Sequence, residues 1–148
     1  MTYTETVVAA AKAFKVSSSL LLAICTHESG GLKNVLVPHD HGTPTYGICQ
    51  VKAGTAEMFG YKNEGTGLMD PATNAKYAAL YLRYQLDRYD QDPCMSVAAY
   101  NAGSFNESTK VPGKPKNLRY VRLVQEQLPV GERHLLSCEL EMAASRNE

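Results

Sequence analysis

One carboxylic acid stands out by its position in the sequence. Glu28 follows Ile24 by four residues and Leu20 by eight, in a segment whose broad apolar content predicts a buried helix. In a helix these three side chains share one stripe, so the carboxyl group is expected to face the core. Removal from water penalises the charged form and raises the pKa, which suits a general acid near neutral pH. The alternative is a partly exposed glutamate at a helix end, and position alone does not separate the two.

The segments that must position this group are predicted to be helices. Thr2 and Glu5 have the spacing of a capping box, and Ser17 can cap the helix that carries Glu28 and stops at residues 30–31. Asp70 before Pro71 gives the strongest helix start in the chain. The helices expected from these starts and from apolar periodicity cover residues 2–14, 18–29, 53–59, 71–89, 93–103, 118–128 and 132–144.

Two segments lack any period and are predicted to be loops, at residues 32–45 and, rich in lysine, at residues 104–116. Strand patterns and internal repeats are nearly absent. The predicted fold class is therefore mainly α, in one domain that spans residues 1–148.

Composition excludes several classes of protein. The chain has 148 residues, 44% of them apolar, with 15 basic and 15 acidic side chains, so a compact domain without an overall field for nucleic acid is expected. The longest apolar run, residues 20–25, is too short to span a membrane. The first eleven residues lack the pattern of a secretory signal peptide, so delivery outside the cytoplasm would need another carrier.

The cysteines and histidines are candidates for cross-links or metal ligands. The four cysteines are widely spaced without a CxxC pair, which favours reduced thiols in the core over disulfides. His39 and His41 flank Asp40, and His-x-His is a plausible pair of zinc ligands, but a third ligand at convincing spacing is missing. We therefore expect neither a metal nor a cofactor. The four cysteines are Cys25, Cys49, Cys94 and Cys138.

Three short motifs carry a family resemblance. Residues 28–30 read Glu-Ser-Gly, residues 46–51 read Tyr-Gly-Ile-Cys-Gln-Val and residues 98–103 read Ala-Ala-Tyr-Asn-Ala-Gly. In this order and spacing they resemble the motifs of the soluble lytic transglycosylase catalytic domain, which is kin to goose-type lysozyme. Residues 68–82 and 120–124 also look like segments of that family. The resemblance covers residues 16–124 and implies a lysozyme-like fold.

The resemblance implies a reaction on peptidoglycan with Glu28 as the sole catalytic acid and base. Such enzymes cut the β-1,4 bond between N-acetylmuramic acid and N-acetylglucosamine and leave a 1,6-anhydro sugar, because the muramyl 6-hydroxyl attacks its own ring. The substrate supplies the nucleophile, so the usual second carboxylate is not required.

Other residues match family positions that contact sugar. Gln50, Tyr100 and Asn101 match residues that line the cleft, and Tyr120 matches a tyrosine near the catalytic carboxyl. Their alternatives are a core aromatic for Tyr100 and a residue at a helix C-terminus for Asn101.

The second motif departs from the family pattern. Cys49 stands where the family has a sugar-contacting methionine, so exchange of Cys49 for methionine is expected to be nearly neutral. A family serine near the acid has no clear counterpart, and Thr43 and Thr45 are candidates. Ser29 is expected to support the turn after Glu28 rather than to touch sugar.

Two rival functions are also compatible with the sequence. Asp40 could activate water across the cleft, as in an inverting hydrolase, which would make the chain a muramidase. A non-catalytic wall-binding or structural module is the rival from another class. The freestanding size and absent signal also suggest a bacteriophage virion or lysis component, or a cargo of an export machine, acting at the cell wall in the periplasm. Residues 132–144 could then dock on a partner protein.

Overall fold

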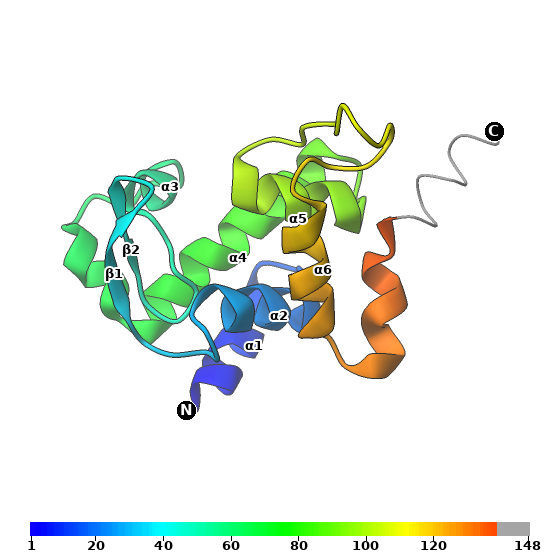
Figure 1. Cartoon of the computed structure of the whole chain (residues 1–148). Helices are drawn as coiled ribbons and strands as arrows, with labels where there is room; N and C mark the ends of the chain where they lie inside the picture. The colour runs from blue at the N-terminus through cyan, green and yellow to red at the C-terminus, as the bar shows by residue number, and fades with distance from the viewer. Residues whose placement is uncertain (139–148) are drawn as a thin grey trace. The chain divides into compact units, whose positions relative to one another are not determined.

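The computed structural model describes residues 1–138, which belong to two compact units. The first unit comprises residues 1–83 and the second begins at Tyr84. Helices dominate both units (Figure 1), so the predicted mainly α class is confirmed. The longest helix, α4 (Pro71–Arg88), contributes to both. The assignment of the whole chain to one domain stays a prediction.

Two capped helices form the start of the first unit. In α1 (Tyr3–Ala13), the Thr2 hydroxyl accepts a hydrogen bond from the Glu5 backbone N–H at 3.1 Å, as the capping box predicted. In α2 (Ser18–Glu28), the Ser17 hydroxyl accepts from the backbone N–H of Leu20 at 3.2 Å. The two helices pack against each other. The side chains that they bury completely include Val7, Ala11, Leu21 and Ile24.

A hairpin occupies the segment that the sequence predicted to be a loop. Strands β1 (Leu36–Asp40) and β2 (Thr43–Tyr46) pair antiparallel, with an irregular register between Val37 and Asp40. The prediction was wrong because most strand residues are exposed, so their side chains show no alternation of polar and apolar types. A proline in each strand also weakened the strand pattern.

Short helices connect the hairpin to α4. They are α3 (Ala53–Glu57) and the 3₁₀ helix η1 (Gly65–Met69), and η1 contacts β2. The carboxylate of Asp70 then caps α4 by accepting from the Thr73 backbone N–H at 3.0 Å and from its hydroxyl at 2.8 Å. These two bonds favour the charged form and lower the pKa of Asp70 below its usual 3.8.

The second unit contains α5 (Pro93–Ala102), α6 (Leu118–Glu126) and the 3₁₀ helix η2 (Val130–Leu136). The first two agree with the predicted helices, and η2 lies where a helix over residues 132–144 was expected; residues 139–144 fall outside the described part. The η2 segment packs against α5 and α6 and buries Leu136 in the core of this unit, while its other side chains, such as Leu135, are mostly exposed. Docking of residues 132–144 on a partner stays a prediction.

All four cysteines form disulfides, which corrects the prediction of reduced thiols. Cys25 in α2 is bonded to Cys49, and Cys94 in α5 is bonded to Cys138. The paired Cα atoms lie 4.1 and 5.2 Å apart, so the fold brings each pair within bonding reach. The sequence could not indicate this, because the partners are 24 and 44 residues apart and come together only through packing.

In the described residues no helix combines the length and the apolar character that crossing a membrane would require.

The role of η2 predicts a stability difference between two truncated chains. Ending the chain after Pro129 removes Leu136 and Cys138, whereas ending it after Cys138 keeps both. We expect the shorter chain to lose about 3 kcal/mol or more of unfolding free energy, since a buried leucine and a disulfide are lost together. Urea unfolding of both chains measures this. If the short chain is insoluble, Leu136→Ala in the full chain tests the same packing, and unchanged stability would contradict it.

The cap of α4 predicts a pH-dependent contribution to stability. Asp70→Ala should cost about 1 kcal/mol at pH 7, because the first turn of α4 loses its acceptor. Folding lowers the pKa of Asp70, so the charged carboxylate adds to the unfolding free energy above about pH 4. This contribution is lost as the pH falls through the lowered pKa. Urea unfolding at pH 7 and pH 3 measures the difference. Asp70→Asn is the control, since its amide caps the helix without titrating near these pH values.

Candidate functional site

Glu28 is the last residue of α2, and its side chain is half-buried. The stripe that it shares with Leu20 and Ile24 is buried at those two positions. The helix ends directly after Glu28, which explains why the acid is less buried than the residues one and two turns earlier. The carboxyl group thus lies where a buried helix reaches the surface of the first unit.

The turn after Glu28 is fixed by Ser29. Its hydroxyl donates to the Cys25 carbonyl at 3.0 Å and accepts from the Lys33 backbone N–H at 2.9 Å. The chain then reverses through Gly30 and Gly31, whose φ angles of 69° and 118° suit glycine. Ser29 is buried, and these bonds confirm that it supports the turn.

The imidazole next to Glu28 in the sequence is partly removed from water. His27 is half-buried, and desolvation lowers its pKa below 6.5.

The second motif folds into a tight turn. Backbone hydrogen bonds join Tyr46 and Val51 in both directions, at 3.0 and 2.9 Å, and the Gly47 N–H donates to the Val35 carbonyl at 2.8 Å. Gln50 adopts a positive φ of 51° inside this turn. Such a conformation is uncommon for a residue other than glycine and needs support from its surroundings.

The side chain of Gln50 supplies that support. Its Nε2 donates to the carbonyls of Val35 and Gly47 at 2.8 and 2.9 Å, and its Oε1 accepts from the hydroxyl of buried Thr45 at 2.6 Å. Both amide hydrogens are thus engaged, one within the turn and one with the segment that precedes β1. These contacts position the turn; that Gln50 also lines the sugar cleft stays a prediction.

Asn74 also holds this turn in place. The motifs did not single out this buried amide as a site residue. Asn74 in α4 has no exposed surface; its Oδ1 accepts from the Cys49 N–H at 2.8 Å, and its Nδ2 donates to the carbonyls of Tyr46 and Leu68 at 2.6 and 2.8 Å. Gly47 makes this approach possible, since a Cβ there would lie 2.6 Å from Asn74 Cγ.

Cys49 cannot serve as the predicted sugar contact in this structure. Its side chain has no exposed surface, and its sulfur is bonded to Cys25, one turn before Glu28. The disulfide therefore ties the turn of the second motif to the helix that carries the acid. This also overturns the expectation that methionine at this position would be nearly neutral.

The candidates for a second carboxylate and for the missing serine lie in the hairpin. Asp40 is at the end of β1 with 40% of its side chain exposed, and its Oδ1 lies 3.7 Å from Nε2 of the almost fully exposed His41. The exposed Thr43 donates only a long bond of 3.4 Å to the Asp40 carbonyl. Among residues 1–138 no three His, Cys, Asp or Glu side chains gather as a metal site would require.

The second unit carries the remaining predicted residues. Tyr100 is half-buried and Asn101 is exposed in the last turn of α5, and Tyr120 is half-buried in α6. The C-terminal end of α5 is held by Arg88, whose guanidinium donates to the Gly103 carbonyl at 2.8 Å. Asn117, which sequence reasoning missed, donates a side-chain hydrogen bond to Asn101 at 3.0 Å.

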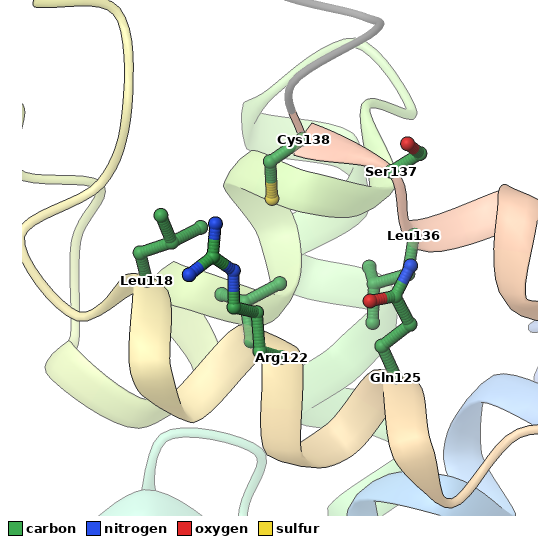
Figure 2. Close-up of a pocket in the computed structure, with 7 residues that line it drawn as sticks. Leu118, Arg122, Gln125, Leu136, Ser137 and Cys138 are labelled. Carbon is green, nitrogen blue, oxygen red and sulfur yellow. The ribbon is translucent and has the colours of Figure 1, made fainter. Parts of the chain in front are cut away.

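The second unit also contains a pocket of about 230 Å³ between α6 and residues 136–138 (Figure 2). Polar groups of Arg122, Gln125 and Ser137 stand at its walls beside apolar side chains. None of the residues predicted to bind sugar lines it. Its complete lining is Leu118, Val121, Arg122, Gln125, Leu136, Ser137 and Cys138.

Comparisons with known proteins agree with the resemblance in the motifs. The sequence model of one family, described as the Transglycosylase SLT domain, matches residues 5–120. The soluble lytic murein transglycosylase of Escherichia coli K12 is 30% identical over 125 residues, which cover 80% of this chain and 18% of that protein. The chain thus spans about a fifth of that relative's length.

Solved structures of similar fold come from the same kind of enzyme. An inactive mutant of the lytic transglycosylase Slt from Pseudomonas aeruginosa matches with a TM-score of 0.57 and 21% identity, over 97% of this chain and 24% of that one. The 70 kDa soluble lytic transglycosylase from Escherichia coli matches with a TM-score of 0.57 and 24% identity, over 95% and 23%. The predicted lysozyme-like fold is thereby confirmed.

The contact between Gly47 and Asn74 predicts that a methyl group at residue 47 is costly. In Gly47→Ala the new Cβ would meet the Asn74 amide and the Leu68 carbonyl, at a φ of 81° that disfavours alanine. We expect a loss of about 2–5 kcal/mol of unfolding free energy. Chemical denaturation measures it. Gly54→Ala is the control, because Gly54 lies in α3 and a Cβ added there would have no neighbouring atom within 4 Å, so a gain of about 0.5–1 kcal/mol is expected.

The disulfide at Cys49 predicts that exchange of this residue for methionine destabilises the protein. Cys49→Met breaks the bond to Cys25 and should lower the unfolding free energy by about 3 kcal/mol. Thermal unfolding with and without dithiothreitol measures this effect. With dithiothreitol both proteins lack the bond. The difference between their melting temperatures should then narrow to the part that is due to side-chain packing. Equal melting temperatures without the reductant would contradict the prediction.

Proposed function

This chain belongs to the Transglycosylase SLT domain family, and from that premise we propose that it is a peptidoglycan lytic transglycosylase. It would cleave the β-1,4 bond between N-acetylmuramic acid and N-acetylglucosamine and leave a 1,6-anhydro-muramic end. The observation that carries the proposal is the extent of the family match, residues 5–120, which includes Glu28, Gln50, Tyr100, Asn101 and Tyr120.

In the proposed mechanism one carboxyl group acts twice. Glu28 first gives its proton to the glycosidic oxygen as the bond from that oxygen to C1 of the muramyl ring breaks. The resulting carboxylate then takes the proton of the muramyl 6-hydroxyl. At the same time the oxygen of that hydroxyl forms the new bond to C1. The acid is regenerated and no water is consumed. The tethered hydroxyl has the proximity advantage of an intramolecular nucleophile over bulk water.

The other residues are proposed to bind the sugar or to hold the residues that do. Tyr100, Asn101 and Tyr120 offer hydroxyl and amide groups, which suit a neutral, hydroxyl-rich ligand. Gln50 contributes through the shape of its turn, since its amide hydrogens bond to backbone carbonyls. Buried Cys49 is not proposed to touch substrate.

We propose that the protein works in an oxidising compartment such as the periplasm, where peptidoglycan lies. Two disulfides support this, because such bonds persist outside the reducing cytoplasm. A virion or an export machine as the carrier stays a prediction of the sequence.

The proposal predicts a specific product mass. Purified peptidoglycan incubated with the protein should release muropeptides that end in 1,6-anhydro-muramic acid, lighter by one water than the products of a hydrolysing muramidase. Mass spectrometry of the released fragments measures this. Glu28→Gln, which is nearly isosteric but cannot transfer the proton, should lower the rate by about 10²–10⁴-fold or more.

Different outcomes separate the rival functions. Activity of Glu28→Gln within tenfold of the unchanged protein would refute the role of Glu28. Predominantly hydrated products would refute the transglycosylase reaction, and their loss in Asp40→Asn would then establish a muramidase that uses Asp40. No release by a folded protein would favour a binding module.

A further inference from the structure

The side chain of Asn117 connects the start of α6 to the end of α5. Asn117 directly precedes α6, and its Nδ2 donates to the Ala98 carbonyl and to Asn101 Oδ1, each at 3.0 Å. Both acceptors belong to α5 and to the third motif. One half-buried amide thus contacts the backbone and a side chain of that motif at once.

The backbone bond determines which way the Asn117 amide faces. A carbonyl oxygen can only accept a hydrogen bond, so Asn117 must turn Nδ2, and not Oδ1, toward Ala98. The second hydrogen of the same Nδ2 then meets Asn101. An amide that faces a donor must present its oxygen, so Asn101 directs Oδ1 at Asn117 and Nδ2 away from it.

The two hydrogens of Asn101 Nδ2 are consequently left for other partners. Asn101 is exposed, and within residues 1–138 its Nδ2 makes no hydrogen bond. The backbone beneath it is held at Gly103, whose carbonyl accepts from Arg88 at 2.8 Å. Asn101 is therefore a fixed donor on a fixed helix end.

We propose that Asn117 is a positioning residue that makes Asn101 a hydrogen-bond donor toward the substrate. The group that Asn101 binds is then an acceptor, namely a hydroxyl or acetamide carbonyl oxygen of the glycan. This inference rests on the proposed function, which it deepens by naming the polarity of one contact. Without Asn117 the Asn101 amide would adopt both orientations, and only one of them would bind that oxygen.

A reversal of the Asn101 amide tests the proposal. In Asn117→Asp the carboxylate cannot donate, so it loses the bond to the Ala98 carbonyl, and it should accept from Asn101 Nδ2, which turns the Asn101 oxygen outward. We expect kcat/KM on soluble glycan strands to fall about tenfold, the equivalent of one hydrogen bond lost and a repulsive acceptor pair gained. Asn117→Ala frees the Asn101 amide without reversing it. We then expect kcat/KM to fall about threefold, which corresponds to the lower end of the range of free energies for a single hydrogen bond.

Two controls isolate the path through Asn101. Asn106→Asp introduces the same charge on an exposed asparagine of the loop after α5 and should leave kcat/KM unchanged. In an Asn101→Ala background, Asn117→Asp should cause no further loss, because the group that it positions is gone. Losses that multiply in the double variant would overturn the proposal, since Asn117 would then act elsewhere.

Nuclear magnetic resonance tests the orientation independently of catalysis. The ¹⁵N-bound side-chain protons of Asn101 should shift downfield in Asn117→Asp, as one of them becomes a donor to a carboxylate, and should stay in place in Asn106→Asp. Unchanged Asn101 resonances in a folded Asn117→Asp protein would overturn the proposal. If the unchanged protein releases no muropeptides, the proposed function fails, while the amide orientation is still decided by these spectra. Should Asn117→Asp not fold, Asn117→Ala should increase the side-chain mobility of the Asn101 amide in ¹⁵N relaxation, because the bond that fixes its Oδ1 is lost, and unchanged relaxation would refute the assignment.

Discussion

The buried amide of Asn74 is the interaction on which the first unit depends most. Asn74, which lies in α4, bonds to the turn of the second motif and to η1 through three hydrogen bonds, and its side chain has no exposed surface. A buried amide whose donors and acceptor are all satisfied specifies one arrangement, because every alternative leaves a polar group unpaired. Gly47 is needed for this approach, and the disulfide of Cys49 extends the same constraint to the helix of Glu28. The acid and the turn are therefore held by one connected set of bonds within the first unit.

The sequence predicted the helices well because their starting points are local. Thr2, Ser17 and Asp70 each bond to a backbone N–H three residues ahead, so the pattern and the interaction lie in the same short segment. The hairpin had no such local pattern, since its strands bury little. The disulfides also had none, because a pairing across 24 or 44 residues is decided by packing and not by spacing.

The candidate site shows the same division between local and distant information. Glu28 could be selected from its helical stripe and its motif, both of which are visible in the sequence. The hydrogen bonds of Gln50 reach back as far as Val35, and those of Asn117 join residues 16 and 19 positions away, so neither could be read from a short pattern. Sequence reasoning thus proposed candidate site residues, but it missed which residues hold them in place.

The connectivity of the disulfides has a consequence for how the chain acquires them. Four cysteines allow three pairings, and this chain uses the one that joins the first to the second and the third to the fourth. For a polypeptide that leaves a ribosome or a membrane pore with its N-terminus first, Cys49 meets Cys25 before Cys94 has emerged. An oxidant that acts on thiols in order of appearance therefore makes the native bonds directly, and no step of rearrangement by an isomerase is required.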